Sequence, residues 1–281
     1  MPYTVRQMLK EEAEGIFNWG KREGWNYGFH DWDIMYDVEP KGYFVGVLDG
    51  ETVGCIAGVQ YERKYGYLTL FMVRPEYRGR GYGVALWKRA LGYLNEEVEV
   101  ESVGLDAVLE REKDYQKWGF RSYYNITGCT YDVDKKFSRR YPPVEEKHFQ
   151  DIAEYDLKVF QVNRASFLHD YIFKTEAMTC VAYEGNKLAG FAVARPCWRG
   201  YKVCPIFADN DGVARGLLES AMADLQGQMI TLEVPGPNKG GLKLAEDFNM
   251  KFWHSTARMY TAEKYHQDTR YIYSNTTRIV G

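Results

Sequence analysis

The 281-residue sequence contains only five cysteines, and their spacing suits neither disulfide bonds nor a zinc ion. Their number is odd, and no two of them form a C-x-x-C pair. Disulfide frameworks and zinc sites both need cysteines in sets at characteristic spacings. The sequence therefore predicts free thiols in a reducing compartment and no bound metal.

Long apolar runs and a surplus of positive charge are also missing. No stretch approaches the ~18 consecutive apolar residues of a membrane-spanning helix, and the N-terminal residues MPYTVRQMLKEEAEG lack the apolar core of a signal peptide. Residues 1–140 carry 20 Lys and Arg against 22 Asp and Glu, and the rest of the chain carries 16 against 17. Neither half offers the basic surface that nucleic acid requires. We expect a cytoplasmic protein with no membrane and no nucleic-acid partner.

The pattern of apolar residues predicts a mixed fold. Hydrophobic residues make up 45% of the chain, which at this length can bury a sizeable core and favours two domains. In the first half, a helix at 10–22 precedes a hairpin of residues 43–48 and 52–59, with Asp49-Gly50 as the turn signal. A strand at 67–73, a helix at 84–91, a strand near 98–105 and a helix ending in KWGF follow. This order predicts an α+β fold whose mixed, mostly antiparallel sheet is flanked by helices.

The second half repeats this order of elements. TCVAYEGNKLAGFAVA at 179–194 parallels FVGVLDGETVGCIAGV at 44–59 as strand, turn and strand. A strand in YKVCPIF, a helix at about 213–225, a strand in QMITLEV, a helix through residue 244 and a strand in MKFWHSTARMYT complete the repeat. The simplest interpretation is an internal duplication with a period of roughly 140 residues. We expect domains at residues 1–138 and 139–281, joined through a linker that contains Pro142-Pro143.

Three glycines at alternate positions separate the strand at 67–73 from the helix at 84–91. The segment RPEYRGRGYG contains Gly79, Gly81 and Gly83. A strand, a glycine turn and a helix can bind phosphate through converging backbone N–H groups and the helix dipole. The spacing differs from the G-x-G-x-x-G of a dinucleotide site and from the P-loop motif, and the segment is not a low-complexity RNA-binding tract. An ordinary tight turn would need only one glycine.

These residues resemble the GNAT superfamily of N-acetyltransferases. The central motif of that family is [Q/R]-x-x-G-x-[G/A] after V-x-P, and it is matched by Val73, Pro75, Arg78, Gly81 and Gly83. A later motif, Tyr-x-x-x-Gly-Phe at the end of a helix, is matched by YQKWGF at 115–120. Over nearly its whole length the chain is similar to a two-domain subgroup with a C-terminal acetyltransferase-like domain of the YitH/HolE type. The resemblance implies tandem GNAT folds.

The resemblance also implies an N-acetyltransferase that uses acetyl-CoA. The pyrophosphate would lie on the glycine turn, and the pantetheine arm would follow the end of the preceding strand. The residues implied for this cofactor are Met72, Val73, Arg78, Gly79, Arg80, Gly81, Tyr82, Gly83 and Val84. A backbone N–H of the strand can stabilise the oxyanion, and Tyr115 can protonate the leaving thiolate, whose intrinsic pKa is near ~8.5.

An aromatic early loop is the expected acceptor site. The strand at 68–73 lacks the glutamate that some family members use as general base, so a water relay, or a carboxylate or histidine of this loop, must deprotonate the amine. The loop EGWNYGFHDWD, residues 23–33, interleaves aromatic rings with charged groups, which suits a cation. We expect a small primary amine (an amino sugar, polyamine or amino-acid derivative) to contact Glu23, Trp25, Asn26, His30 and Asp31. The alternative is a hydrophobic cluster that packs the first helix onto the sheet.

The second half lacks the glycine turn. Its strand-to-helix junction reads PIFADNDGVARGLL, with Asp209 and Asp211 where an anion would lie. As capping groups, these aspartates would occupy the N–H groups of the helix. We expect this half not to bind acetyl-CoA but to wall the substrate pocket, bind a regulator or form a homodimer. Two alternatives stay open for the whole chain: an acetyl-CoA sensor or scaffold without activity, and a transferase that uses a longer acyl-CoA.

Overall fold

The computed structural model describes residues 2–262, 265, 267–278 and 280. Its α-helices are α1 (Ala13–Arg22), α2 (Asp31–Val38), α3 (Tyr82–Gly92), α4 (Glu112–Gln116), α5 (Phe149–Phe160), α6 (Ala165–Phe173), α7 (Asp211–Met222) and α8 (Lys239–Asp247). Its strands are β1 (Thr4–Gln7), β2 (Tyr43–Leu48), β3 (Glu51–Tyr61), β4 (Tyr65–Val73), β5 (Ser102–Val108), β6 (Arg121–Asp132), β7 (Met178–Glu184), β8 (Lys187–Pro196), β9 (Tyr201–Ala208), β10 (Met229–Pro235), β11 (Lys251–Tyr260) and β12 (Ile272–Ser274).

In the described residues the strands form one continuous sheet. Its order is β1-β2-β3-β4-β5-β11-β6-β10-β9-β8-β7, and β12 pairs with β9. Among the strand pairs of the described residues, only two are parallel: β4 with β5, and β10 with β9. Each half therefore contributes an antiparallel hairpin followed by a parallel pair, which confirms the expected mixed, mostly antiparallel sheet flanked by helices.

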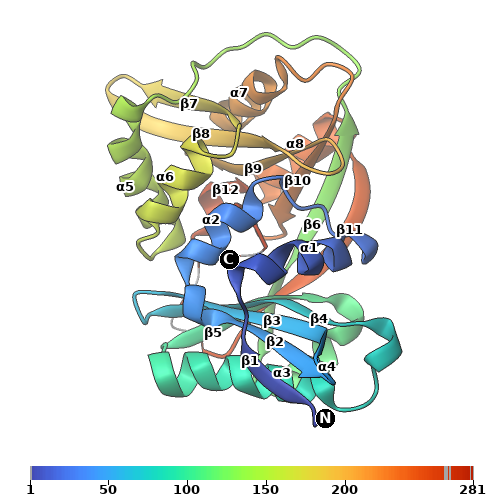
Figure 1. The fold of residues 1–281 in the computed structure, drawn as a ribbon. Coiled ribbons are helices and arrows are strands. Elements are labelled where there is room, and N and C mark those ends of the chain that lie inside the picture. Colours follow the sequence, from blue (N-terminus) through green and yellow to red (C-terminus); the bar gives the residue numbers. More distant parts are fainter. Residues whose placement is uncertain (1, 263–264, 266, 279, 281) are drawn as a thin grey trace.

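The two halves exchange their last long strands. β6 comes from the first half but pairs with β10 of the second, from Asp132 opposite Met229 to Ile126 opposite Pro235. β11 comes from the second half but pairs with β5 of the first. The two exchanged strands also pair with each other, and Figure 1 shows them running between the halves. The expected domain boundary after residue 138 falls between β6 and α5.

Three hydrophobic clusters support this arrangement. One lies beneath α3, with Leu86 and Trp87 buried on the sheet, and includes Ala257 and Met259 of β11. A second lies beneath α7. The largest contains residues of both halves, among them Tyr65, Phe160 and Tyr265. Figure 1 shows α1 and α2 between the two halves of the sheet. The halves thus share an apolar core rather than meeting at a wet surface.

Three details differ from the expectations. The strand expected near 98–105 lies at Ser102–Val108, because the preceding helix continues as a π-helical turn over Tyr93–Val98. The early loop ends in a helix, since α2 begins at Asp31. The tail, which carries no clear pattern, contains β12. In each case a tertiary contact fixes a segment whose local sequence signal is weak.

A buried ion pair ties the early loop to the second half. The Asp31 carboxylate contacts the Arg195 guanidinium of β8, and the two side chains are only 1% and 2% exposed. Asp31 also accepts a hydrogen bond of 2.9 Å from the Gly28 N–H. Nearby, Asn26 exchanges two hydrogen bonds with the backbone of Arg199, at 2.8 and 3.0 Å. The early loop is therefore docked onto β8 and its following turn.

Replacing Asp31 by Asn should destabilise the fold. Asn keeps the acceptor for Gly28 but leaves the Arg195 charge buried without a counter-charge, which should lower the free energy of unfolding by about 3–5 kcal/mol. Denaturant titration measures this loss, and Asp33→Asn, on the exposed face of α2, is the matched control. Adding Arg195→Met to Asp31→Asn should recover part of the loss. Equal stability of Asp31→Asn and wild type would contradict the assignment.

Candidate functional site

The site begins where two parallel strands separate. β4 and β5 pair only at Tyr65, Gly66 and Tyr67, opposite residues 102–104. Farther along β4, the register with β3 shifts and Leu70 adopts a φ of +53°, a conformation that bulges the strand. The Cys55 thiol donates to the Leu70 carbonyl at 3.1 Å and so fixes the bulge from the β3 side. The backbone of β4 after Tyr67 is therefore open toward β5.

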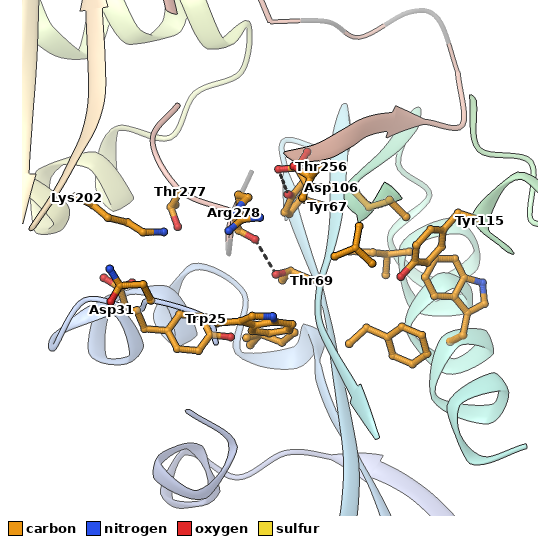
Figure 2. A pocket seen from close by; sticks show the side chains of 18 of the residues that line it. Trp25, Asp31, Tyr67, Thr69, Asp106, Tyr115, Lys202, Thr256, Thr277 and Arg278 are labelled. Atoms are coloured by element: carbon orange, nitrogen blue, oxygen red, sulfur yellow. Dashed lines mark hydrogen bonds between the residues drawn. The ribbon is translucent and has the colours of Figure 1, made fainter. Parts of the chain in front are cut away.

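A cavity of about 180 Å³ lies along this opening. It is lined by β4 and β5, by the early loop, and by residues of the second half and the tail. Figure 2 shows Tyr115 on one side of the central strands and Asp31, Lys202 and Thr277 on the other. The lining residues are Trp25, Asn26, Tyr27, Asp31, Tyr67, Leu68, Thr69, Leu70, Phe71, Trp87, Leu105, Asp106, Val108, Tyr115, Arg195, Lys202, Thr256, Thr277 and Arg278.

Tyr115 lies at the apolar end of the cavity. Its ring is 5.2 Å from the ring of Trp87, centroid to centroid, and Trp87 in turn packs on Phe71 and Phe120. Burial raises the pKa of the Tyr115 hydroxyl, and the nearby Arg111 opposes this only in part. The hydroxyl is therefore protonated at neutral pH and is a hydrogen-bond and proton donor to whatever occupies this end.

Glycine is required at the three positions of the turn for two different structural reasons. Gly79 and Gly81 have φ values of +77° and +84°, and a β-carbon at either would meet open space. These two residues are thus needed for the left-handed backbone of the turn. A β-carbon on Gly83 would come within 3.3 Å of the Phe71 ring, so Gly83 lets α3 pack closely on β4. Gly81 is the N-cap of α3. The Val84 N–H donates to the Gly81 carbonyl at 3.1 Å, so the N–H groups that the first turn can offer to a ligand are those of Tyr82 and Gly83.

The side chains around the turn are held by neighbours. Arg78 donates from Nε to the Val73 carbonyl at 2.7 Å and pairs with Glu23. The Tyr82 ring stacks on Tyr3, with centroids 4.4 Å apart, and Arg80 lies over the Tyr77 ring. Met72 and Val73 line another cavity together with Glu23, and Val84 is exposed. What this loop presents to a ligand is mainly backbone.

The early-loop residues do not all reach the main cavity. Trp25, Asn26 and Asp31 line it, although Asp31 is paired with Arg195 and Asn26 with the Arg199 backbone. Glu23 pairs with Arg78 beside the glycine turn. His30 is outside the main cavity, with Nε2 3.7 Å from a Glu176 carboxylate oxygen. The sequence therefore groups five residues that the fold distributes over three places.

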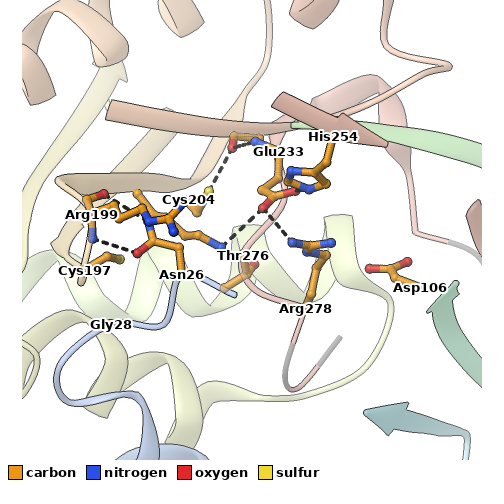
Figure 3. A network of polar contacts seen from close by, with 12 residues as sticks. Asn26, Gly28, Asp106, Cys197, Arg199, Cys204, Glu233, His254, Thr276 and Arg278 are labelled. Atoms are coloured by element: carbon orange, nitrogen blue, oxygen red, sulfur yellow. Dashed lines mark hydrogen bonds and ion pairs between the residues drawn. The ribbon is translucent and has the colours of Figure 1, made fainter. Parts of the chain in front are cut away.

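Lys202 and Arg278 of the second half, which sequence reasoning missed, line the other end of the cavity, and both lie at ion-pair distance from Glu233. Glu233 of β10 lies 3.3 Å from the Lys202 ammonium. It also lies 3.5 Å from Arg278 and 3.2 Å from His254 Nε2 (Figure 3). Burial alone would raise the pKa of the Glu233 carboxyl, but Arg278, Lys202 and His254 together hold that pKa well below its ordinary value. Lys202 and Glu233 are charged residues within apolar strands, and that is the signal that could have revealed them.

Asp106 of β5 anchors a second charged group beside the cavity. It accepts hydrogen bonds from the Tyr67 hydroxyl at 2.9 Å and from Arg258 of β11 at 3.0 Å. Burial opposes the charge of Arg258, yet Asp106 keeps the pKa of the guanidinium well above its ordinary value. The exchanged strand β11 thus supplies the counter-charge for a cavity residue of the first half.

The second half has the same divergence of strands, but its own chain fills it. β9 and β10 pair only at residues 201–202 and 230–231. Beyond these pairs, β12 lies antiparallel to β9, and the Ser274 hydroxyl accepts a 3.0 Å hydrogen bond from the Glu233 N–H of β10. The N-cap of α7 is Asn210, which accepts from the Val213 N–H; Asp209 and Asp211 instead accept from Tyr155 and Tyr273. The expected capping thus comes from the residue between the two aspartates.

Two features are absent from the part of the chain that the structure describes. No helix there is both long and apolar enough to cross a membrane. Within the same residues, no three His, Cys, Asp or Glu side chains are grouped so that they could hold a metal ion.

Comparison with known proteins finds two related domains in this chain. The Acetyltransferase (GNAT) family matches residues 4–120, and an Acetyltransferase (GNAT) domain matches residues 152–274. A curated relative is the holothin acyltransferase of Pseudoalteromonas sp. (strain SANK 73390), 24% identical over 265 residues, which cover 93% of this chain and 89% of the relative.

Solved structures share the fold over nearly the full length. A putative acetyltransferase from Pyrococcus horikoshii superposes with a TM-score of 0.82 at 23% identity, covering 99% of this chain and 96% of that one. A tandem GNAT protein from the clavulanic acid biosynthesis pathway gives a TM-score of 0.65 at 12% identity, covering 92% and 98%. The likeness to a tandem protein agrees with one repeat in each half.

Proposed function

This chain belongs to the GNAT family of acyltransferases, with one GNAT domain in each half, and on that premise we propose that it transfers the acetyl group of acetyl-CoA to the primary amine of a small molecule. The observation that carries the proposal is the cavity along the divergence of β4 and β5, which has a protonated Tyr115 at one end and a polar chamber at the other. The two reactants would enter from opposite sides of β4 and meet in a ternary complex.

Acetyl-CoA would occupy the opening with backbone contacts. Its pyrophosphate would take the N–H groups that follow Gly81, where the dipole of α3 favours an anion. The pantetheine arm would extend along the free edge of β4 as an added strand. The bulge at Leu70 interrupts the regular pairing of β4 beside the cavity, where a backbone N–H would stabilise the oxyanion as the amine attacks.

The chemical step is a direct transfer. The amine nitrogen forms a bond to the thioester carbon, and the bond from that carbon to sulfur breaks. The amine loses a proton, and the departing thiolate takes one from the Tyr115 hydroxyl, which solvent then reprotonates. Because Asp31 is held by Arg195 and His30 lies outside the cavity, we assign the proton of the amine to a water relay rather than to the early loop.

The glycine turn should be essential for cofactor binding. In Gly81→Asp, a carboxylate would stand at the N-cap of α3 and repel the pyrophosphate, so the affinity for acetyl-CoA should fall at least 100-fold. Calorimetric titration measures this. Gly50→Asp is the matched control, because Gly50 has a similar φ of +85° and open space around it but lies in the turn between β2 and β3. Undiminished affinity in Gly81→Asp would rule this site out.

Tyr115→Phe should separate catalysis from binding. Loss of the proton donor should lower kcat by roughly 10- to 1000-fold while the affinity for acetyl-CoA stays near wild type. Thiol release in steady state gives kcat, and calorimetry gives the affinity. Tyr183→Phe removes a tyrosine hydroxyl outside the cavity and should leave both unchanged. A fully active Phe variant would reduce Tyr115 to a packing residue.

The chain should bind one acetyl-CoA. β12 occupies the divergence of β9 and β10, and Asn210 caps α7, so we infer that the second half offers neither the strand edge nor the helix N-terminus. Calorimetric titration of the wild type should give a stoichiometry near one per chain, and Gly81→Asp should remove it altogether. Two equivalent sites, or a residual tight site in Gly81→Asp, would refute this inference.

A further inference from the structure

We propose that the acceptor carries a carboxylate beside its amine, and that Lys202 and Arg278 bind this carboxylate. The inference rests on the proposed function, because it names the substrate class of the same site. It selects an amino-acid derivative over a polyamine or an amino sugar without an acidic group.

The first support is the balance of charge around the cavity. Asp31 is paired with Arg195, and Asp106 with Arg258. Lys202 and Arg278 share the remaining carboxylate, and both approach the same oxygen, Oε1 of Glu233, at 3.3 and 3.5 Å. The other oxygen of Glu233 faces His254. Even with a neutral His254, the cavity is surrounded by more positive than negative charges. The four cations are Arg195, Arg258, Lys202 and Arg278, and the three carboxylates are Asp31, Asp106 and Glu233.

The second support is burial. The side chain of Lys202 is 10% exposed and that of Arg278 is 23% exposed. Lys202 is thus mostly buried and Arg278 partly buried, and charges that lose water need a counter-charge, because desolvation of an unpaired ion is costly. Within residues 2–262, 265, 267–278 and 280, Glu233 is the one carboxylate at ion-pair distance from either. An ammonium has three donors and a guanidinium five, so both retain donors for a ligand.

The third support is position. The Thr69 hydroxyl donates to the Arg278 carbonyl at 3.0 Å, which holds the tail beside β4 one residue before the Leu70 bulge. The tail therefore places Arg278 next to the point where the thioester would lie. Figure 2 shows Lys202, Thr277 and Arg278 facing Asp31 and Trp25 across the cavity. A carboxylate held here leaves the amine of the same small molecule near the thioester, with Trp25 beside the intervening carbons.

The early loop does not provide the alternative, a cation site. Glu23 pairs with Arg78 outside the main cavity, and Asp31 is neutralised by Arg195. A polyamine would therefore add positive charge to a chamber that already has an excess of it. A zwitterionic amino acid adds no net charge to the chamber, and its carboxylate would face the excess of cations.

Matched pairs of acceptors test the proposal. Thiol release from acetyl-CoA would be measured with α- and ω-amino acids from glycine to 6-aminohexanoate, with the carboxamide of each, and with spermidine. The wild type should use at least one amino acid with a kcat/KM at least tenfold above that of its amide. Equal use of the amide, or preference for spermidine, would overturn the carboxylate site.

Substituting Lys202 and Arg278 one at a time tests whether these residues bind the carboxylate of the acceptor. Lys202→Met leaves Glu233 paired with Arg278, and Arg278→Met leaves it paired with Lys202, so neither variant leaves the buried Glu233 without a counter-charge. Either change should raise the KM for the amino acid at least tenfold, with little effect on kcat or on the KM of the amide. Lys251→Met, an exposed lysine on β11, is the control. An unchanged preference for the amino acid in both variants would remove these residues from the site.

A binding measurement separates this inference from the proposed reaction. The N-acetylated amino acids and their amides would be titrated into the protein with CoA present, and the melting temperature recorded. Acids should raise it and amides should not, and Lys202→Met should abolish the difference. If no amine releases thiol but the acids still bind through Lys202, acetyl transfer fails and the carboxylate site stands. If no acid binds better than its amide, the carboxylate site is wrong.

Discussion

The divergence of two parallel strands is the constraint on which the rest of this structure depends. Parallel pairing between β4 and β5 stops after Tyr67, and pairing between β9 and β10 stops after two residues. Each divergence leaves backbone N–H and C=O groups that must find partners elsewhere. In the second half β12 supplies them, through Ile272 and Ser274. In the first half a cavity lies along the opening, and this difference between the two related halves is the basis for our proposal that only the first half binds acetyl-CoA.

The second half contributes to the site through strand exchange and through the tail. β11 brings Arg258 to Asp106, and the chain after β12 continues to the cavity with Thr277 and Arg278. A shared apolar core and the Asp31–Arg195 pair keep the halves in one arrangement. The second half therefore lines the cavity that we propose as the acceptor chamber, and this would explain its presence without a regulator or a homodimer.

The buried charges differ in what they contribute. Asp31 with Arg195, and Asp106 with Arg258, are contact pairs, and the charge of Asp106 also favours the charged form of Arg278. Such pairs specify geometry more than they stabilise, because desolvation offsets most of the attraction. The single negative charge of Glu233 faces the two positive charges of Lys202 and Arg278 and cannot neutralise both. Burying that excess of positive charge costs desolvation free energy, which is the physical reason to connect it with a ligand.

The sequence by itself determined the features that depend on near neighbours in the chain. The order of strands and helices, the repeat and the glycine turn all follow from local patterns, because φ values at Gly79 and Gly81 and the apolar period of each strand are local properties. Only the tertiary structure decided which charges face the cavity. Asp31 and His30 are adjacent in sequence, yet one is buried against Arg195 and the other lies outside with Glu176. Lys202 and Arg278 are 76 residues apart and meet only because β12 fills one divergence and carries the tail to the other. Pairing between distant segments depends on the whole packing, which no window of sequence contains.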